Sequence, residues 1–152
     1  MNYETALENI RNIVKKHINM FSENAYDITI LPGWISIVEN LLDKIQQEID
    51  GTNGRIKIVQ IKEKFGGLRF YFGSEGLDDV IVKRISAYVL EAMKLSESSC
   101  VICGEAGERM NDGYITVRCG NHQDLEQEIF KNYNFVSFVK HEDELAKLLG
   151  QR

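Results

Sequence analysis

The 152-residue sequence contains one proline and three cysteines, and it has no long hydrophobic run. A single proline excludes proline-rich linkers and ligand segments. No stretch approaches the roughly 20 apolar residues of a membrane-spanning helix, which excludes a membrane protein of that class. The first sixteen residues carry acidic side chains and lack the apolar segment of a secretory signal peptide. We therefore expect a cytoplasmic protein that does not contact a membrane.

The chain also lacks the excess of basic residues that indiscriminate nucleic-acid binding requires. It has 18 Lys and Arg against 23 Asp and Glu, a net charge of −5 at pH 7 with neutral histidines. Hydrophobic residues make up 43% and charged residues 27%, which excludes a disordered tail. The length favours a single domain. Within it we expect a helix and hairpin core (1–98), a metal-binding subdomain (99–131), and a C-terminal strand and helix (132–152).

Hydrophobic periodicity predicts two helices in the first third of the chain. Apolar residues recur in steps of three and four over residues 3–21 and again over residues 34–49, which is typical of amphipathic helices. Trp34, at the start of the second helix, is predicted to be a core anchor because large aromatic residues dominate the burial of small cores. His17 stands among Lys and Glu residues, and we expect it at the surface.

Residues 55–72 predict a β-hairpin, with Gly66-Gly67 as the turn signal between β-branched and aromatic runs. Ile56 and Ile58 share one face, but Val59 and Ile61 have the opposite phase. This break requires a bulge or a strand buried on both faces. A helix is expected over 78–97, and the last residues predict a helix (123–132), a short strand (135–139) and a helix (141–150). The fold class is therefore α+β, with helices packed on a small antiparallel sheet.

The three cysteines lie in one segment with the pattern C-x2-C-x15-C-x2-H. Two pairs at this spacing match structural zinc sites. Gly104 suits a knuckle turn after the first pair, and residues 113–119 can supply a strand that returns to the metal. The last two ligands then open a helix near Gln123, which is the order of a treble-clef finger. We predict a structural Zn²⁺ held by Cys100, Cys103, Cys119 and His122, here called the Cys3His cluster.

Two alternatives to this site remain open. If His122 points away, His141 is the nearest substitute ligand. The cysteines could also be three small buried residues beside a surface histidine, although two x2 spacings rarely arise by accident.

Catalytic motifs are missing around the cysteines. Four protein ligands leave no open position for water on zinc, which favours a structural role. A zinc deaminase needs H-x-E before its cysteine pair, but the only earlier histidine is followed by Ile18 and Asn19. No H-E-x-x-H, G-x-G-x-x-G or P-loop motif occurs. We therefore favour a protein that is not an enzyme.

Three features together resemble a widespread family of small uncharacterised phage, prophage and bacterial proteins. They are Gly33-Trp34 opening a helix, the string KEKFGGLRFY at residues 62–71, and the C-x2-C…C-x2-H order. The resemblance covers residues 32–122. The family usually has a tryptophan after a glycine between its metal pairs, where this chain has Gly113-Tyr114. The resemblance implies a bacterial or phage cytoplasmic origin and the zinc ligands, and it carries over no activity.

The hairpin also provides a candidate binding face rich in positive charge. Its members are Arg55, Lys57, Lys62, Lys64, Arg69 and Tyr71. Such a face can bind phosphates while the tyrosine stacks on a base. We favour the alternative, a solvated face whose lysines protect the sheet from aggregation.

These patterns lead to three functional hypotheses. The first is a non-enzymatic, zinc-stabilised binding protein of the inhibitor or immunity-protein type. Acidic groups at 124–128 and 142–144 would then contact a basic toxin or nuclease. The second is a phage protein that binds nucleic acid through the basic hairpin and the zinc finger. The third, which we favour least, is a zinc-dependent nuclease.

Overall fold

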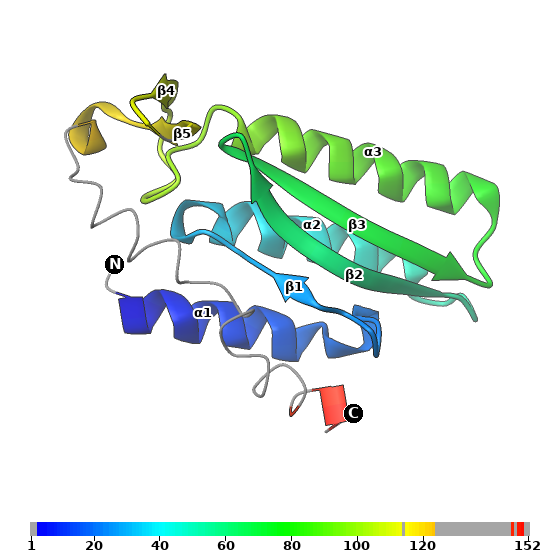
Figure 1. Ribbon diagram of the computed structural model, residues 1–152. Coiled ribbons are helices and arrows are strands. Elements are labelled where there is room, and N and C mark those ends of the chain that lie inside the picture. Colours follow the sequence, from blue (N-terminus) through cyan, green and yellow to red (C-terminus); the bar gives the residue numbers. More distant parts are fainter. Residues whose placement is uncertain (1–2, 114, 124–146, 148, 151–152) are drawn as a thin grey trace.

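The computed structural model describes residues 3–113, 115–123, 147 and 149–150. The helices are α1 (Tyr3–Lys16), α2 (Ile35–Ile49) and α3 (Asp79–Ser96), and the strands are β1 (Asp27–Ile28), β2 (Arg55–Lys64), β3 (Gly67–Glu75), β4 (Glu108–Asn111) and β5 (Ile115–Arg118). Figure 1 shows α2 and α3 behind the β2–β3 hairpin, with the β4–β5 ribbon at one end. The α+β prediction is confirmed. The predicted elements at 123–132 and 135–139, and most of 141–150, lie outside the described residues.

The helix α1 is shorter than predicted. It ends at Lys16, and a 3-10 turn (Ile18–Met20) carries the chain to Phe21, which is buried and forms an isolated bridge with Ile58 of β2. A second 3-10 turn (Pro32–Trp34) leads into α2, and Trp34 has no exposed surface. The prediction that Trp34 anchors the core is therefore confirmed.

The expectation that His17 lies at the surface is wrong. Its side chain is 3% exposed, and its Nε2 lies 2.9 Å from the Asp43 Oδ1 of α2. The Nζ of Lys16 lies 3.0 Å from the same oxygen, and this hydrogen bond is the main reason that the pKa of Asp43 is lowered. His17 follows the buried Ile13 and Val14 by four and three residues, so it continues the apolar stripe of α1.

The main sheet has the order β1-β2-β3. Strands β2 and β3 are antiparallel, and the register shifts between Ile58 and Gln60, so the first of the two expected alternatives, a bulge, is the one found. The bulge explains how residues on both sides of the phase break reach the core (Ile56, Ile58 and Ile61). The strand β1 pairs in parallel with β2 and was not predicted, because two residues carry no periodicity.

The turn of the hairpin differs by one residue from the prediction. Lys64 pairs with Gly67, so the loop residues are Phe65 and Gly66 rather than Gly66 and Gly67. Both have positive φ, +54° and +82°, as a two-residue hairpin loop of the primed type requires. The Glu63 Oε1 accepts a hydrogen bond of 2.6 Å from the Gly66 N–H and closes the loop.

Within the described residues, no helix is both long and apolar enough to cross a membrane.

The end of α3 is tied to the hairpin by a buried serine. The Leu68 N–H donates to the Ser96 Oγ (2.9 Å), and that hydroxyl donates to the Met93 carbonyl (2.6 Å). Ser96→Ala leaves the buried Leu68 N–H without its acceptor, so we expect a decrease of about 1–3 kcal/mol in the free energy of unfolding. Urea denaturation measures the decrease. Ser98→Ala is the matched control, because Ser98 is exposed. Equal stability of the two variants would contradict the prediction.

Candidate metal centre

The first two cysteines lie on a tight knuckle that follows α3. The Gly104 N–H donates to the Cys100 carbonyl (2.8 Å), and the Cys100 N–H donates to the Glu105 carbonyl (2.7 Å). Gly104 has φ +80°, a conformation that glycine adopts without strain. The knuckle expected from the sequence is therefore present.

The other two candidate ligands follow the β4–β5 ribbon. The strands pair from Glu108 with Arg118 to Asn111 with Ile115. Cys119 comes directly after β5, and a 3-10 turn (Gly120–His122) brings His122 back toward it, with a hydrogen bond of 3.0 Å from the His122 N–H to the Cys119 carbonyl. The predicted order of knuckle, hairpin and ligand-bearing turn is thus found. The helix expected beyond Gln123 lies outside the described residues.

The ligand atoms of the Cys3His cluster converge. All four lie within 4.8 Å of one another. The two sulfurs of Cys103 and Cys119 are 3.7 Å apart, and the His122 Nδ1 lies 3.4 Å from the Cys100 sulfur and 3.2 Å from that of Cys119. A tetrahedral zinc with Zn–S near 2.3 Å and Zn–N near 2.0 Å places its ligand atoms about 3.5–3.8 Å apart. The cluster can therefore hold a metal ion of this size. The alternative ligand His141 lies outside the described residues.

The thiols of the cluster differ in acidity. Burial raises the pKa of Cys100, but hydrogen bonds from the backbone of Cys103, Cys119 and Ile102, and then from His122, lower it to about 6. Burial and the neighbouring sulfurs of Cys119 and Cys100 raise the pKa of Cys103 to about 11, against a backbone hydrogen bond at Glu105. The negative charge of one thiolate thus disfavours ionisation of the neighbouring thiol. A bound divalent cation would offset the repulsion between the Cys100 and Cys103 thiolates.

The knuckle is seated against the turn that begins α2. The Gly33 N–H donates to the Val101 carbonyl (2.9 Å). A Cβ on Gly33 would lie 1.8 Å from the Cys100 carbonyl oxygen, and one on Gly104 would lie 2.9 Å from the Gly33 oxygen. The two backbones therefore touch without side chains between them. The sequence identified Gly33 only as the start of a helix, and this role was missed.

Arg118 is a buried cation beside the cluster that the sequence did not identify. Its side chain is 1% exposed. The Nη2 lies 2.6 Å from the Asp112 Oδ1, and the Nη1 donates to the Gln123 carbonyl (2.9 Å). The hydrogen bond from Arg118 lowers the pKa of Asp112. Arg118 thus joins the β4–β5 loop to the turn that carries His122.

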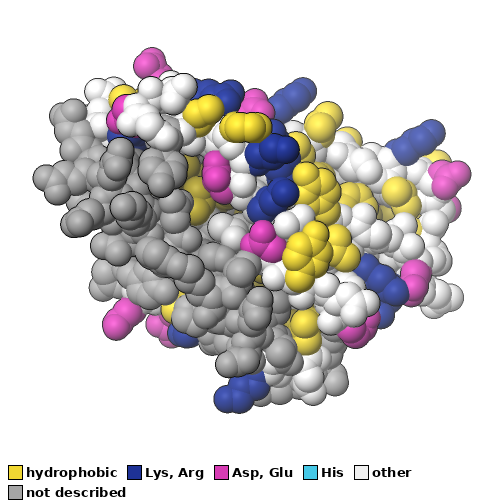
Figure 2. Space-filling model, viewed as in Figure 1, with side chains coloured by type: hydrophobic (Ala, Val, Ile, Leu, Met, Phe, Trp, Pro, Cys, Tyr) yellow, Lys and Arg dark blue, Asp and Glu magenta, His cyan; other side chains and the backbone are white. Residues whose placement is uncertain are grey.

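The second candidate site, the basic hairpin, lies on one face of the sheet. Because of the bulge, Lys57 before it and Lys62 after it lie on the same outer side of β2. Arg69, which pairs with Lys62, and Tyr71 lie on the same side of β3. Figure 2 shows Lys and Arg side chains beside hydrophobic ones over the hairpin. The six predicted residues (Arg55, Lys57, Lys62, Lys64, Arg69 and Tyr71) thus share one side of the hairpin, but Arg55 lies at the opposite end of β2 from Lys64.

The hairpin bases fall into two groups. Arg55 pairs with Glu23 at 3.4 Å, and Lys57 pairs with Glu75, so the half away from the turn is neutralised. None of the ion pairs in the described part of the chain includes Lys62, Lys64 or Arg69. The positive charge is therefore concentrated next to the turn.

Comparisons of the chain with protein-family models, with curated proteins and with solved structures find no match. The family resemblance therefore stays a prediction, and the functional argument rests on the geometry of the two sites.

Proposed function

We propose that the protein is a non-enzymatic binding protein whose fold is completed by a structural zinc in the Cys3His cluster. The observation that supports the metal is the convergence of three sulfurs and one ring nitrogen within 4.8 Å of one another. Four protein ligands leave no open coordination position for a substrate or water. The ribbon β4–β5 has few buried apolar residues, so the metal would supply folding free energy that packing does not.

We further propose that the partner is single-stranded nucleic acid, bound by the part of the hairpin next to its turn. Lys62 lies 5.7 Å from the ring centroid of Tyr71, and Lys64 lies 5.6 Å from that of Phe65. The two aromatic residues are 43% and 58% exposed. Cations without a carboxylate partner beside exposed rings are the combination that binds phosphates and stacks bases in single strands.

Phe65 is the observation that favours this function over a merely solvated face. It is the only non-glycine residue with positive φ among the residues the structure describes. This conformation is strained for a bulky side chain, and exposing a large ring gives no folding benefit. A residue that costs stability and projects into solvent is typical of a binding site.

A protein partner, of the inhibitor or immunity-protein type, is the second candidate. The acidic groups at 124–128 and 142–144 that favoured it lie outside the described residues. A different observation supports it here: a groove of about 450 Å³ between α2 and α3, lined in part by Ile37, Leu41, Tyr88 and Leu95. Leu95 is 50% exposed. The cytoplasmic location and the phage or bacterial origin stay predictions.

Salt dependence tests the proposed partner. Binding of a labelled oligothymidylate should weaken steeply with salt, and the slope of log K against log salt should fall by about 0.7 for each phosphate that the protein no longer neutralises. Lys62→Gln/Lys64→Gln is expected to reduce the slope by about 1.4. The control Lys83→Gln/Lys94→Gln removes the same number of charges from α3, and its slope of log K against log salt should stay close to that of the wild type. No binding at low salt would reject nucleic acid and favour the protein partner.

Phe65→Gly separates stability from binding. Glycine relieves the positive φ, so thermal unfolding should occur at a slightly higher temperature than in the wild type. Removing the ring should weaken oligonucleotide binding by about 1–3 kcal/mol, the usual value for one stacked base. Fluorescence anisotropy and calorimetry measure the two effects. A variant that loses stability, or that keeps full affinity, would contradict the assignment of Phe65 as a stacking residue.

A further inference from the structure

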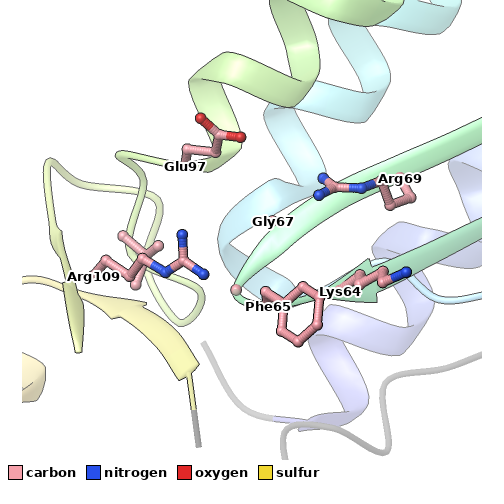
Figure 3. Close-up of a pocket in the computed structure, with 8 residues that line it drawn as sticks. Lys64, Phe65, Gly67, Arg69, Glu97 and Arg109 are labelled. Atoms are coloured by element: carbon pink, nitrogen blue, oxygen red, sulfur yellow. The ribbon is translucent and has the colours of Figure 1, made fainter. Parts of the chain in front are cut away.

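A cleft of about 350 Å³ lies between the turn of the hairpin and the β4–β5 ribbon. Figure 3 shows the guanidinium groups of Arg69, from β3, and Arg109, from β4, pointing toward each other across it. Glu97, at the end of α3, lies at one side of the opening. Arg109 and Glu97 belong to none of the motifs in the sequence, so the cleft is a product of the fold.

Gly67 keeps the cleft open and positions one of its arginines. A Cβ on Gly67 would lie 3.3 Å from the Arg69 Nη1 and 3.7 Å from the Glu97 Cγ. Because Gly67 has no Cβ, the Arg69 side chain can fold back, and its Nη1 donates to the Leu68 carbonyl at 3.0 Å. One guanidinium nitrogen is thus fixed to the backbone, and the planar group is held at the wall of the cleft.

The charge around the cleft is unbalanced. Three cations line it (Lys64, Arg69 and Arg109) against the single carboxylate of Glu97. No ion pair within 4.0 Å joins any of these four in the part of the chain that the structure describes. Facing guanidinium groups repel each other, and an anion between them relieves the repulsion. Their planar donor forks match the oxygens of a phosphate group.

We propose that this cleft binds a phosphate group between Arg69 and Arg109. That the phosphate belongs to a nucleic-acid strand rests on the function proposed above. The exposed ring of Phe65 also lines the cleft, so a strand whose phosphate occupies the cleft can place a neighbouring base on that ring. Arg109 is thereby a binding residue, and Glu97 a residue that limits affinity.

The cleft also connects the ligand to the Cys3His cluster. Arg109 pairs with Val117 of β5, whose carbonyl accepts from the Val101 N–H (2.9 Å) and whose strand leads to Cys119. The wall that carries Arg109 is therefore held by the candidate metal ligands, whereas the opposite wall belongs to the hairpin. Removing the metal should weaken phosphate binding although no metal ligand lines the cleft.

Opposite charge changes on the two sides of the cleft test the proposal. The probe is a labelled oligothymidylate of about ten nucleotides, a length within the range of single-strand sites. Arg109→Ala should weaken its binding to the zinc-loaded protein by about tenfold, the usual effect of removing one charge-assisted hydrogen bond. Glu97→Gln should strengthen binding by about threefold, because the carboxylate repels phosphate. Lys83→Gln, a charge change on α3, should stay within about twofold.

The outcomes separate this proposal from the proposed function. If the wild type binds the oligonucleotide but Arg109→Ala and Glu97→Gln behave like Lys83→Gln, the cleft assignment is wrong and nucleic-acid binding stands. If the oligonucleotide does not bind, a titration with inorganic pyrophosphate tests whether the cleft binds phosphate at all. Pyrophosphate that shifts the NMR signals of the Arg69 and Arg109 side chains keeps the phosphate site and rejects the nucleic acid. Absence of both effects rejects both proposals.

Discussion

Gly33→Ala is expected to be among the most destabilising single substitutions in the chain, although it adds one methyl group. The methyl carbon would lie 1.8 Å from the Cys100 carbonyl oxygen and 2.8 Å from the Val101 carbonyl carbon. Both are backbone atoms, so no side chain can rotate away. The knuckle and the start of α2 must separate, which breaks the hydrogen bond between Gly33 and Val101.

We expect a decrease of about 3 kcal/mol or more in the free energy of unfolding, above the usual cost of overpacking a core. Gly73→Ala is the matched control, because no atom lies within 4 Å of its added carbon. Chemical denaturation of both variants measures the difference. Similar stabilities would show that the knuckle does not sit against Gly33 as described.

Removal of a metal ligand is the second large effect. Cys119→Ser should abolish stoichiometric zinc binding, because it removes one of the four candidate ligand atoms. Structural zinc contributes about 10–16 kcal/mol of binding free energy in small zinc-finger peptides, so the ribbon β4–β5 should unfold without it. The hairpin and α2 share an apolar core around Trp34 and Leu42, to which the knuckle and β5 add only Val101 and Val117, so this core should persist.

Hydrogen exchange locates this effect. In the variant, and in the wild type treated with a chelator, amides of β4 and β5 should lose protection while those of β2 and β3 keep it. Added zinc should restore protection in the wild type and not in the variant. Protection of the ribbon that is unchanged in both samples would mean that packing alone holds this segment.

Local patterns carried much of the sequence-based prediction. The phase break between Ile58 and Val59 indicated a bulge or a strand buried on both faces, and the x2 spacings predicted a cluster that the structure brings together. The start of α3 is also fixed by a local interaction, since the Asp78 carboxylate caps the helix by accepting from the Ile81 N–H (2.9 Å). Such features depend on residues a few positions apart, which is why a single sequence reveals them.

Long-range contacts account for what the sequence did not predict. Gly33 contacts Cys100, and Arg69 and Arg109 line the same cleft. These residues are far apart in the sequence, and hydrophobic periodicity contains no information on such contacts. The burial of Arg118 depends on an ion pair with Asp112 across a loop. His17 is a different case, because its Lys and Glu neighbours suggested the surface, whereas it lies four and three residues after the buried Ile13 and Val14 and is itself buried.

The metal content of the purified protein tests the central claim most directly. Protein prepared without chelators should contain one zinc per chain by elemental analysis, and X-ray absorption should report three sulfur ligands near 2.3 Å and one nitrogen near 2.0 Å. The cluster of Cys100, Cys103, Cys119 and His122 predicts this coordination. A folded protein that contains no metal, and whose ribbon stays protected from hydrogen exchange, would contradict it.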